Sequence, residues 1–148
     1  MFKNILIPTD GSKIATSAAE RAIELAKSMK ARVHVISVSP THKQLTSEGF
    51  ILPEYSVGKS EWDKGVRAKA QTVLDAVAAK ARSAGVPCTT AHVFRDQAYT
   101  AIVDAAKKVR CDLIVMGSHG YGGIKQLVLG SETMRVLQNS KVPVLVYR

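Results

Sequence analysis

The sequence predicts an α/β fold in which helices cover both faces of a parallel sheet. Apolar runs typical of strands alternate with segments whose apolar residues recur at helical spacing. These runs are almost continuously apolar, as expected of parallel strands buried on both sides. The length of 148 residues corresponds to about one domain, so residues 1–148 are expected to form a single unit.

The first half of the chain supplies the first elements of this alternation. Lys3–Thr9 (KNILIPT) predicts a strand, which ends at the polar turn of residues 10–12, and apolar residues then recur at helical spacing over Ala15–Met29. Val33–Val38 predicts a second strand. The range Ser39–Ser60 fits no element. Long structureless loops are functional or disordered, so a lid over a site and a disordered insertion both remain open.

The second half continues the alternation. A helix over Val66–Ala81 is predicted to end at Gly85 and Pro87, residues typical of a helix C-terminus. Asp96 is expected to cap the N-terminus of the next helix, whose apolar residues extend to Val109. The remaining predicted elements are three strands, Cys88–Phe94, Asp112–Gly117 and Val142–Tyr147, and one helix, Ser131–Asn139.

Composition and charge argue against several classes of protein. The formal net charge of +9 suggests a nucleic-acid partner, but the basic residues are scattered along the chain and are not interleaved with aromatic residues, which argues against one. No apolar run approaches 18 residues, so no membrane span is expected. The N-terminus lacks a signal-peptide core, which predicts a cytoplasmic protein. Cys88 and Cys111 have no metal-ligand spacing and are expected to be reduced, packed thiols.

A glycine-rich stretch, Val115–Thr133 (VMGSHGYGGIKQLVLGSET), follows the fourth predicted strand. Each of its five glycines costs roughly 0.5–1 kcal/mol relative to alanine within regular structure, so a tight turn, a close approach or a bound anion should offset the cost. The stretch is neither a Walker A loop nor a dinucleotide fingerprint. Gly130 and Ser131 nevertheless open a helix, and helix N-termini attract phosphate.

The loop Pro8–Ser12 is the second candidate segment. Ligands of open α/β sheets bind beyond the carboxyl ends of strands, so this loop and the glycine stretch would border one crevice if the first and fourth strands were neighbours. Asp10 would repel phosphate but could accept from ribose hydroxyls or hold a divalent cation. The alternative for Asp10 is a turn residue preceding a Ser12 cap.

The pattern G-x2-G-x9-G-[ST], formed by Gly117, Gly120, Gly130 and Ser131, closely resembles the ATP-binding branch of the universal stress protein family. ILIPTDGS near the start and VPVLVY at the end extend the resemblance over the chain. It implies a Rossmann-like open sheet of strand order 3-2-1-4-5 and binding of ATP, ADP or AMP, with or without Mg²⁺. It also implies a homodimer through Val142–Tyr147, and an apolar edge strand does need a partner.

The resemblance also implies the roles of individual residues. Pro8 and Asp10 would lie against adenine and ribose, with Thr9 beside them, and Asp10 would reach a nucleotide-bound Mg²⁺. Val38 would offer backbone hydrogen bonds to adenine, and Met116 would line the base pocket. The phosphates would be cradled by Gly117, Ser118, His119, Gly120, Gly130, Ser131, Glu132 and Thr133. Glu132 departs from the valine of many members, and it would repel a triphosphate unless it faced solvent or shared a metal.

The resemblance and these residues favour a nucleotide-binding regulator of stress response and survival, with little or no turnover. No catalytic residue is expected, and His119 is interpreted as a loop or phosphate-donor residue. The alternative is a slow ATPase or another adenylate-handling enzyme, although HxGH and SGGxDS are absent. A phosphoacceptor receiver domain would need an acidic pair where Asp10 stands alone. Trp62 and Tyr55 are expected over the nucleotide or at the dimer seam.

Overall fold

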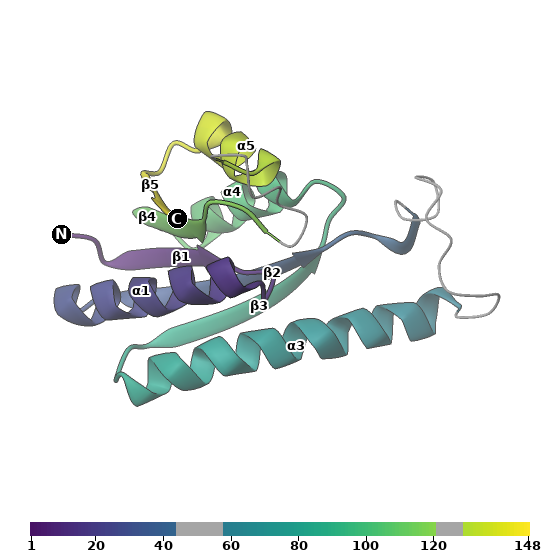
Figure 1. The fold of residues 1–148 in the computed structure, drawn as a ribbon, viewed down its shortest axis with the longest axis horizontal. Coiled ribbons are helices and arrows are strands. Elements are labelled where there is room, and N and C mark those ends of the chain that lie inside the picture. The colour runs from purple at the N-terminus through teal and green to yellow at the C-terminus, as the bar shows by residue number, and fades with distance from the viewer. Residues whose placement is uncertain (44–57, 121–128) are drawn as a thin grey trace.

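The structure is a computed structural model that describes residues 1–43, 58–120 and 129–148. Five parallel strands form one sheet in the order β3-β2-β1-β4-β5, which confirms the predicted fold class and strand order (Figure 1). The strands are β1 (Asn4–Pro8), β2 (Arg32–Ser39), β3 (Cys88–Phe94), β4 (Leu113–Gly117) and β5 (Val144–Tyr147). The described helices are α1 (Lys13–Met29), α3 (Lys59–Ser83), α4 (Ala98–Lys108) and α5 (Ser131–Asn139).

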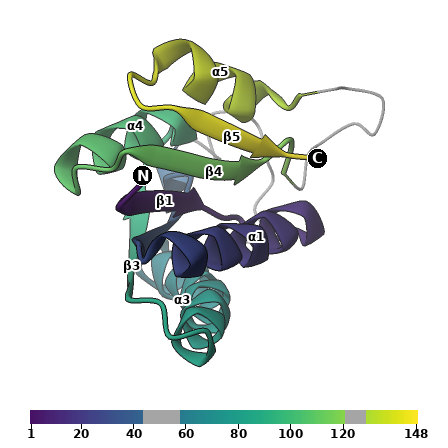
Figure 2. The same cartoon turned by 90° about the vertical axis from the view of Figure 1, so that its left-hand side faces the viewer.

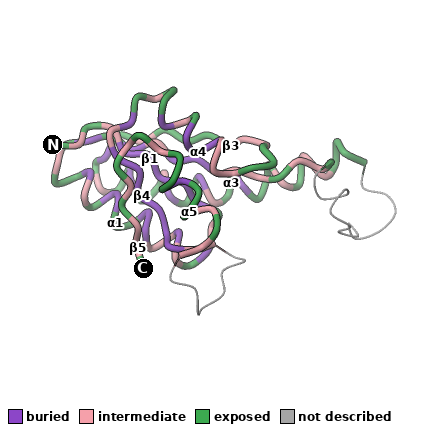
Figure 3. Tube along the Cα trace, turned by 90° about the horizontal axis from the view of Figure 1, so that it is seen from above, coloured by how far each residue is buried: buried purple, intermediate pink, exposed green. Residues whose placement is uncertain are grey.

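Helices cover both faces of the sheet. In Figure 2, α1 and α3 lie on one side, and α4 and α5 lie on the other. Alternate residues of β1 serve the two layers, since Ile5 and Ile7 pack against α1 and α3 while Leu6 packs toward α4 and α5. The central strands therefore carry apolar residues on both faces, as their sequence predicted. Figure 3 shows the burial concentrated there and the outer turns of α3 exposed.

The neighbouring positions of β1 and β4 decide where a site can form. Ile5 pairs with Leu113, and Leu6 pairs with Ile114. The loops that follow the two strands consequently leave the same edge of the sheet side by side. This confirms the adjacency on which the predicted crevice depended.

Helix α3 begins seven residues before the predicted start, at Lys59 instead of Val66. Its first turns are largely exposed and carry an ion pair between Lys59 and Asp63 at 2.9 Å. Because this part of the helix has little to bury, it has no apolar periodicity from which its extent could be predicted. The predicted stop is confirmed, since Gly85 adopts a φ of +73° directly after the helix.

The predicted cap at Asp96 is wrong. The N-cap of α4 is Gln97, whose side chain makes no capping hydrogen bond. The Asp96 carboxylate instead accepts hydrogen bonds from the hydroxyl and the backbone N–H of Thr41, just beyond β2. Asp96 thus links the segment after β2 to the connection between β3 and α4. The N-terminus of α4 is capped by a carboxylate from another helix, as described below.

The unassigned range Ser39–Ser60 falls partly within these elements. β2 extends to Ser39 and α3 begins at Lys59. Residues 44–57, which include Tyr55, lie outside the described residues, so the lid and the disordered insertion both stay predictions.

Both cysteines are free thiols, and burial raises the pKa of Cys111 to about 12. Within the described ranges, no helix combines the length and apolarity that a membrane span requires.

We expect Gly11→Ala to destabilise the protein more than Gly85→Ala. Both glycines have positive φ, at +78° and +73°, so each alanine should cost about 1–2 kcal/mol. A Cβ on Gly11 would also lie 2.7 Å from Val73 Cγ2, whereas open space surrounds Gly85. This overpacking should add about 1–3 kcal/mol, measured as the free energy of unfolding in urea.

The double variant Gly11→Ala/Val73→Ala tests that cause. It should lose less stability than the sum of its two single variants, because the shortened side chain makes room for the new methyl group. Equal losses for Gly11→Ala and Gly85→Ala would contradict the proposed steric conflict.

Candidate functional site

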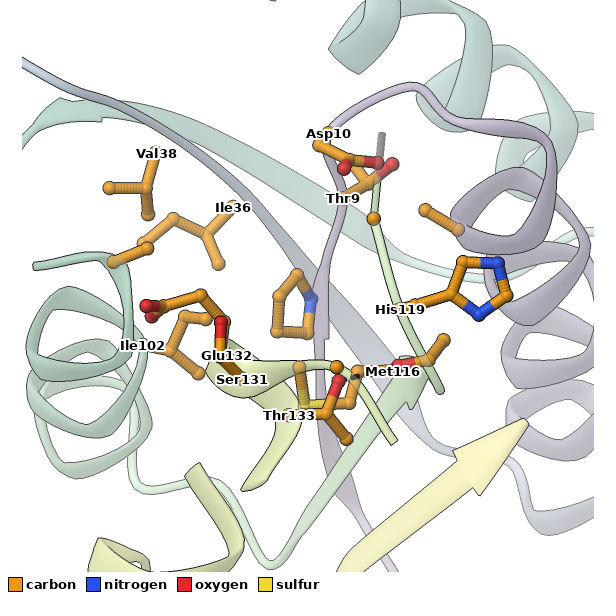
Figure 4. A pocket seen from close by; sticks show the side chains of 16 residues that line it. Thr9, Asp10, Ile36, Val38, Ile102, Met116, His119, Ser131, Glu132 and Thr133 are labelled. Carbon is orange, nitrogen blue, oxygen red and sulfur yellow. Dashed lines mark hydrogen bonds between the residues drawn. The ribbon is translucent and has the colours of Figure 1, made fainter. Parts of the chain in front are cut away.

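A cavity of about 450 Å³ opens at the carboxyl edge of the sheet (Figure 4). Its volume falls within the range of small-molecule sites. The described residues that line it include all but one of the predicted site residues: Pro8, Thr9, Asp10, Val38, Met116, Gly117, His119, Gly120, Gly130, Ser131, Glu132 and Thr133. Segments distant in the sequence therefore meet around one volume, which is the arrangement a ligand site requires.

Ser118 is the predicted site residue that does not line the cavity. It is buried, and its backbone N–H donates to the carbonyl of Tyr147 at 2.7 Å. Its carbonyl accepts from the N–H of Gly130 at 2.6 Å. Ser118 thus joins the ends of β4 and β5 to the start of α5, and its backbone holds the cavity wall together.

Four apolar lining residues were missed by the sequence reasoning: Ala15, Ile36, Ala98 and Ile102. Ile36 lies two residues before Val38 and therefore on the same face of β2, which is a usable signal. Ala98 and Ile102 lie four residues apart on α4, but only the tertiary structure brings that helix to the cavity. Figure 4 shows Ile36, Val38 and Ile102 on one side of the cavity, which gives that side an apolar wall.

The loop after β1 is built from short side chain to backbone hydrogen bonds. Asp10 Oδ1 accepts from the N–H of Ser12 at 2.9 Å, and Thr9 Oγ1 accepts from the N–H of Gly11 at 3.2 Å. Ser12 then caps α1, since its Oγ accepts from the N–H of Ala15 at 3.3 Å. The turn role considered for Asp10 is therefore present, and its exposed carboxylate still borders the cavity.

Gly120 brings the two loops into direct contact. A Cβ at this position would collide with Asp10 Oδ2, so a larger residue here would require the Asp10 carboxylate to move. Gly130 is similarly confined, because a Cβ there would lie 3.0 Å from His119 Cα. At these two positions, the glycines of the predicted motif are explained by close packing around the cavity.

The N-terminus of α5 faces the cavity without a side-chain cap. Its N-cap is Gly130, and no capping hydrogen bond from a side chain is present among the described residues. The first intrahelical bond runs from the N–H of Met134 to the carbonyl of Gly130 at 3.0 Å. The N–H groups of residues 131–133 precede that bond, so this end of the cavity is suited to an anion.

Thr133 lines the cavity and also makes a hydrogen bond that stabilises the fold. Its buried hydroxyl donates to the carbonyl of Gly117 at 3.0 Å and so ties α5 to the end of β4. The sequence analysis expected this hydroxyl to donate toward phosphate, but here its proton is committed to Gly117. Ser131 remains exposed at the same rim.

The Glu132 side chain is 40% exposed, and its carboxylate is held by two hydrogen bonds. Its Oε2 accepts from the N–H of Tyr99 at 2.8 Å, and its Oε1 accepts from Arg135 Nη1 at 3.1 Å. Tyr99 lies in the first turn of α4, the helix whose own N-cap side chain makes no capping bond. Glu132 therefore caps α4 from α5, where the helix dipole and the Arg135 guanidinium offset its negative charge.

Figure 4 shows the consequence for the cavity. The Glu132 carboxylate lies toward Ile102, away from Asp10 and His119. His119 is half-buried, and its Nδ1 lies 3.1 Å from Ser118 Oγ. In the described part of the chain, no three His, Cys, Asp or Glu side chains gather in a way that could hold a metal ion. A Mg²⁺ ion reached by Asp10 through a nucleotide stays a prediction.

Trp62 does not belong to the cavity lining. It projects from α3 and makes ring contacts with His42 at 5.4 Å and Phe94 at 6.1 Å, measured between centroids. The expectation that Trp62 packs over a nucleotide is therefore not supported by its position. Its rings help to hold the outer part of α3 against the ends of β2 and β3.

Comparison with known proteins identifies relatives over the full length of the chain. The universal stress protein family matches residues 1–148. The chain is 34% identical to universal stress protein MJ0531 of Methanocaldococcus jannaschii, covering 100% of this chain and 83% of the relative. It is 32% identical to universal stress protein YxiE of Bacillus subtilis, covering 100% of both chains.

Solved structures share the fold. Protein MJ0577 of Methanocaldococcus jannaschii superposes with a TM-score of 0.79 at 27% identity, over 99% of this chain and 96% of that one. A universal stress protein in complex with cAMP gives a TM-score of 0.71 at 24% identity, over 99% and 97%. One from Archaeoglobus fulgidus in complex with dAMP gives 0.71 at 19% identity, over 99% and 98%.

We expect Glu132→Ala to destabilise the protein by about 1 kcal/mol, the usual cost of a lost helix cap. The substitution removes the acceptor of the Tyr99 N–H. Glu132→Gln should lose less, because its amide oxygen can still accept from that N–H. The free energy of unfolding in urea measures both effects.

Glu61→Ala is the matched control, because Glu61 is an exposed carboxylate in the first turn of α3. It should change the free energy of unfolding by less than about 0.5 kcal/mol, as do most surface substitutions. If Glu132→Ala were no more destabilising than Glu61→Ala, the capping role of Glu132 would be wrong.

Proposed function

Because the chain belongs to the universal stress protein family, we propose that it is an adenine-nucleotide-binding regulator of stress response and survival. The ligand would be ATP, ADP or AMP in the cavity at the carboxyl edge of the sheet. The observation that carries this proposal is that apolar side chains and the uncapped N-terminus of α5 line the same cavity. A nucleotide needs both, because it carries a flat base and phosphate.

The geometry suggests how the nucleotide would lie. The base would pack against Ile36, Val38 and Met116, with the backbone of Val38 as its hydrogen-bonding edge. The phosphates would approach the N–H groups at the start of α5 beside Gly130. The ribose would then fall near Asp10, whose carboxylate borders the cavity. Complexes of the same fold with cAMP and dAMP are consistent with this choice of ligand.

We propose binding without turnover. The carboxylates among the described lining residues, Asp10 and Glu132, each accept a hydrogen bond from a backbone N–H. No lysine or arginine is among the described lining residues. Enzymes that transfer phosphoryl groups surround the transferring phosphate with metal ions and cationic side chains. The bound nucleotide would therefore act as a signal and would not be consumed.

Nucleotide binding is tested by denaturing the purified protein and identifying any released nucleotide by chromatography and mass. The stripped protein is then titrated with ATP, ADP and AMP by calorimetry, with and without Mg²⁺. We expect one adenine nucleotide per chain. Gly130→Ala should weaken binding at least tenfold, because its methyl group would press against His119 at the start of α5.

Gly65→Ala is the matched control. A Cβ at Gly65, on the exposed part of α3, meets nothing within 4 Å, so binding should remain unchanged. A protein that is purified empty and ignores millimolar ATP, ADP and AMP would exclude the proposed ligand. Phosphate release from ATP above the blank, abolished by Asp10→Ala, would instead support the slow-ATPase alternative.

We also propose that two copies of the chain associate through β5. This strand lies at the edge of the sheet, where its outer backbone groups have no strand partner among the described residues. Its Leu145 side chain is 42% exposed, which is unusual for a large apolar residue on a strand. A second copy of β5 would pair these groups and cover the side chain.

Light scattering coupled to gel filtration tests the association. The native chain is expected at twice the mass of 16.0 kDa, and Leu145→Lys should shift it to the monomer. Thr90→Lys is a suitable control, because Thr90 is exposed on β3 at the opposite edge and should leave the mass unchanged. A monomeric native chain at high micromolar concentration would refute the dimer. A predicted cytoplasmic location is compatible with either result.

A further inference from the structure

The amino edge of the sheet, opposite the cavity, gathers exposed basic side chains. In a parallel sheet with crossover helices, the starts of the strands and the ends of the helices meet at this edge. Backbone hydrogen bonds join the segments there, including the N–H of Arg32 to Lys3 at 3.0 Å and the N–H of Asp112 to Asn4 at 2.9 Å. The exposed basic residues of this edge are Lys3, Lys27, Lys30, Arg32, Arg82, Lys107, Lys108, Arg110 and Lys141.

Little negative charge opposes these nine residues, which we call the basic edge. Asp112 lies among them, and its two oxygens accept from the N–H groups of Lys3 and Asn4 at 2.8 and 3.0 Å. Glu24, which pairs with Arg21, lies beside the end of α3 at Ser83 and Ala84. The ion pairs among the described residues all use other basic side chains: Arg21, Lys59, Lys80, Arg95 and Arg135. The basic edge therefore accounts for most of the formal net charge of +9.

Stabilisation of helix C-termini explains only part of the basic edge. Lys27, Arg82, Lys107 and Lys108 lie in last helical turns, where cations are favourable. Lys30 and Arg110 are different, because they adopt left-handed backbone with φ of 55° and 52°. The equivalent turn after α3 uses Gly85, the residue that adopts this conformation without strain. At two of three equivalent turns, the chain thus has a basic residue where glycine would adopt the left-handed backbone with less strain.

We propose that the basic edge binds the phosphate backbone of double-stranded nucleic acid without reading its bases. The five strands span roughly 19 Å at about 4.8 Å per strand spacing. A duplex presents one negative charge per roughly 1.7 Å with both strands counted, so about eleven phosphates lie along this length and roughly half of them would face the edge. The basic residues are scattered in the sequence, which argued against such a partner, but folding brings nine of them together.

The surroundings of the basic edge favour a duplex over two other anionic partners. Single-stranded nucleic acid is held by stacking on exposed aromatic rings, whereas Phe2, the aromatic residue near this edge, packs against the core. A membrane surface is held by a band of apolar anchors. Of the large apolar residues that are exposed in the described chain, Met1 and Leu137, the latter in the last turn of α5, lie toward this edge, and two such residues do not make a band.

The proposal is tested by fluorescence anisotropy with a labelled 20-base-pair duplex of arbitrary sequence, from 50 to 200 mM NaCl. The key variant is Lys30→Gly/Arg110→Gly, which removes two cations where glycine suits the left-handed backbone, so its melting temperature should not fall. The slope of log affinity against log salt should become shallower by about 1.8, or about 0.9 per lost contact. A second duplex of unrelated sequence should bind equally well.

Lys64→Gln/Lys69→Gln is the matched control, because it lowers the net charge equally on the exposed part of α3. Its affinity and salt slope should equal those of the native chain. Lys107→Gln/Lys108→Gln, which leaves the turns intact, should repeat the loss seen with the glycine variant. Equal losses in the control and edge variants would overturn the proposal, because net charge alone would then explain binding.

Two further results would also overturn the proposal. One is a native chain that does not bind the duplex at 50 mM NaCl. The other is binding to vesicles of phosphatidylserine and phosphatidylcholine in the absence of duplex binding, which would assign the basic edge to a membrane surface.

Discussion

Parallel pairing of β1 with β4 is the constraint on which the rest of the structure depends. The chain first builds outward from β1 to β2 and β3, and then crosses back to place β4 on the other side of β1. This reversal puts α1 and α3 on one face and α4 and α5 on the other (Figure 2). The loops after β1 and β4 diverge at the point of reversal, and the cavity forms between them.

The way in which the helix N-termini are capped determines which groups face the cavity. Three of the described helices, α1, α4 and α5, begin beside the cavity, and each has N–H groups that its own backbone cannot satisfy. Ser12 caps α1 from the loop before it, whereas α4 receives the carboxylate of Glu132 from α5. No side chain among the described residues caps α5 itself, so its N-terminus is left for the cavity. The arrangement also holds the negative charge of Glu132 against α4.

The two edges of the sheet have different chemistry for a common reason. In a parallel sheet, every helix begins at the carboxyl edge and ends at the amino edge, so the helix dipoles are aligned. At the carboxyl edge, backbone N–H groups of the helix N-termini are the positive groups that face the cavity. The described lining of the cavity carries no lysine or arginine. Side-chain cations concentrate at the amino edge instead. The proposed nucleotide and the proposed duplex would therefore occupy opposite ends of the molecule.

The sequence by itself determined the alternation of elements and the positions of the glycine motif, because periodicity and turn chemistry are local properties. With the family resemblance, it predicted all but four of the described lining residues. Tertiary structure decided what depends on distant segments: the cap that Glu132 gives to α4, the bond that turns Asp96 toward Thr41, and the apolar wall from Ile102. It also gathered the basic edge, since residues far apart in the chain become neighbours only when parallel strands start at one edge.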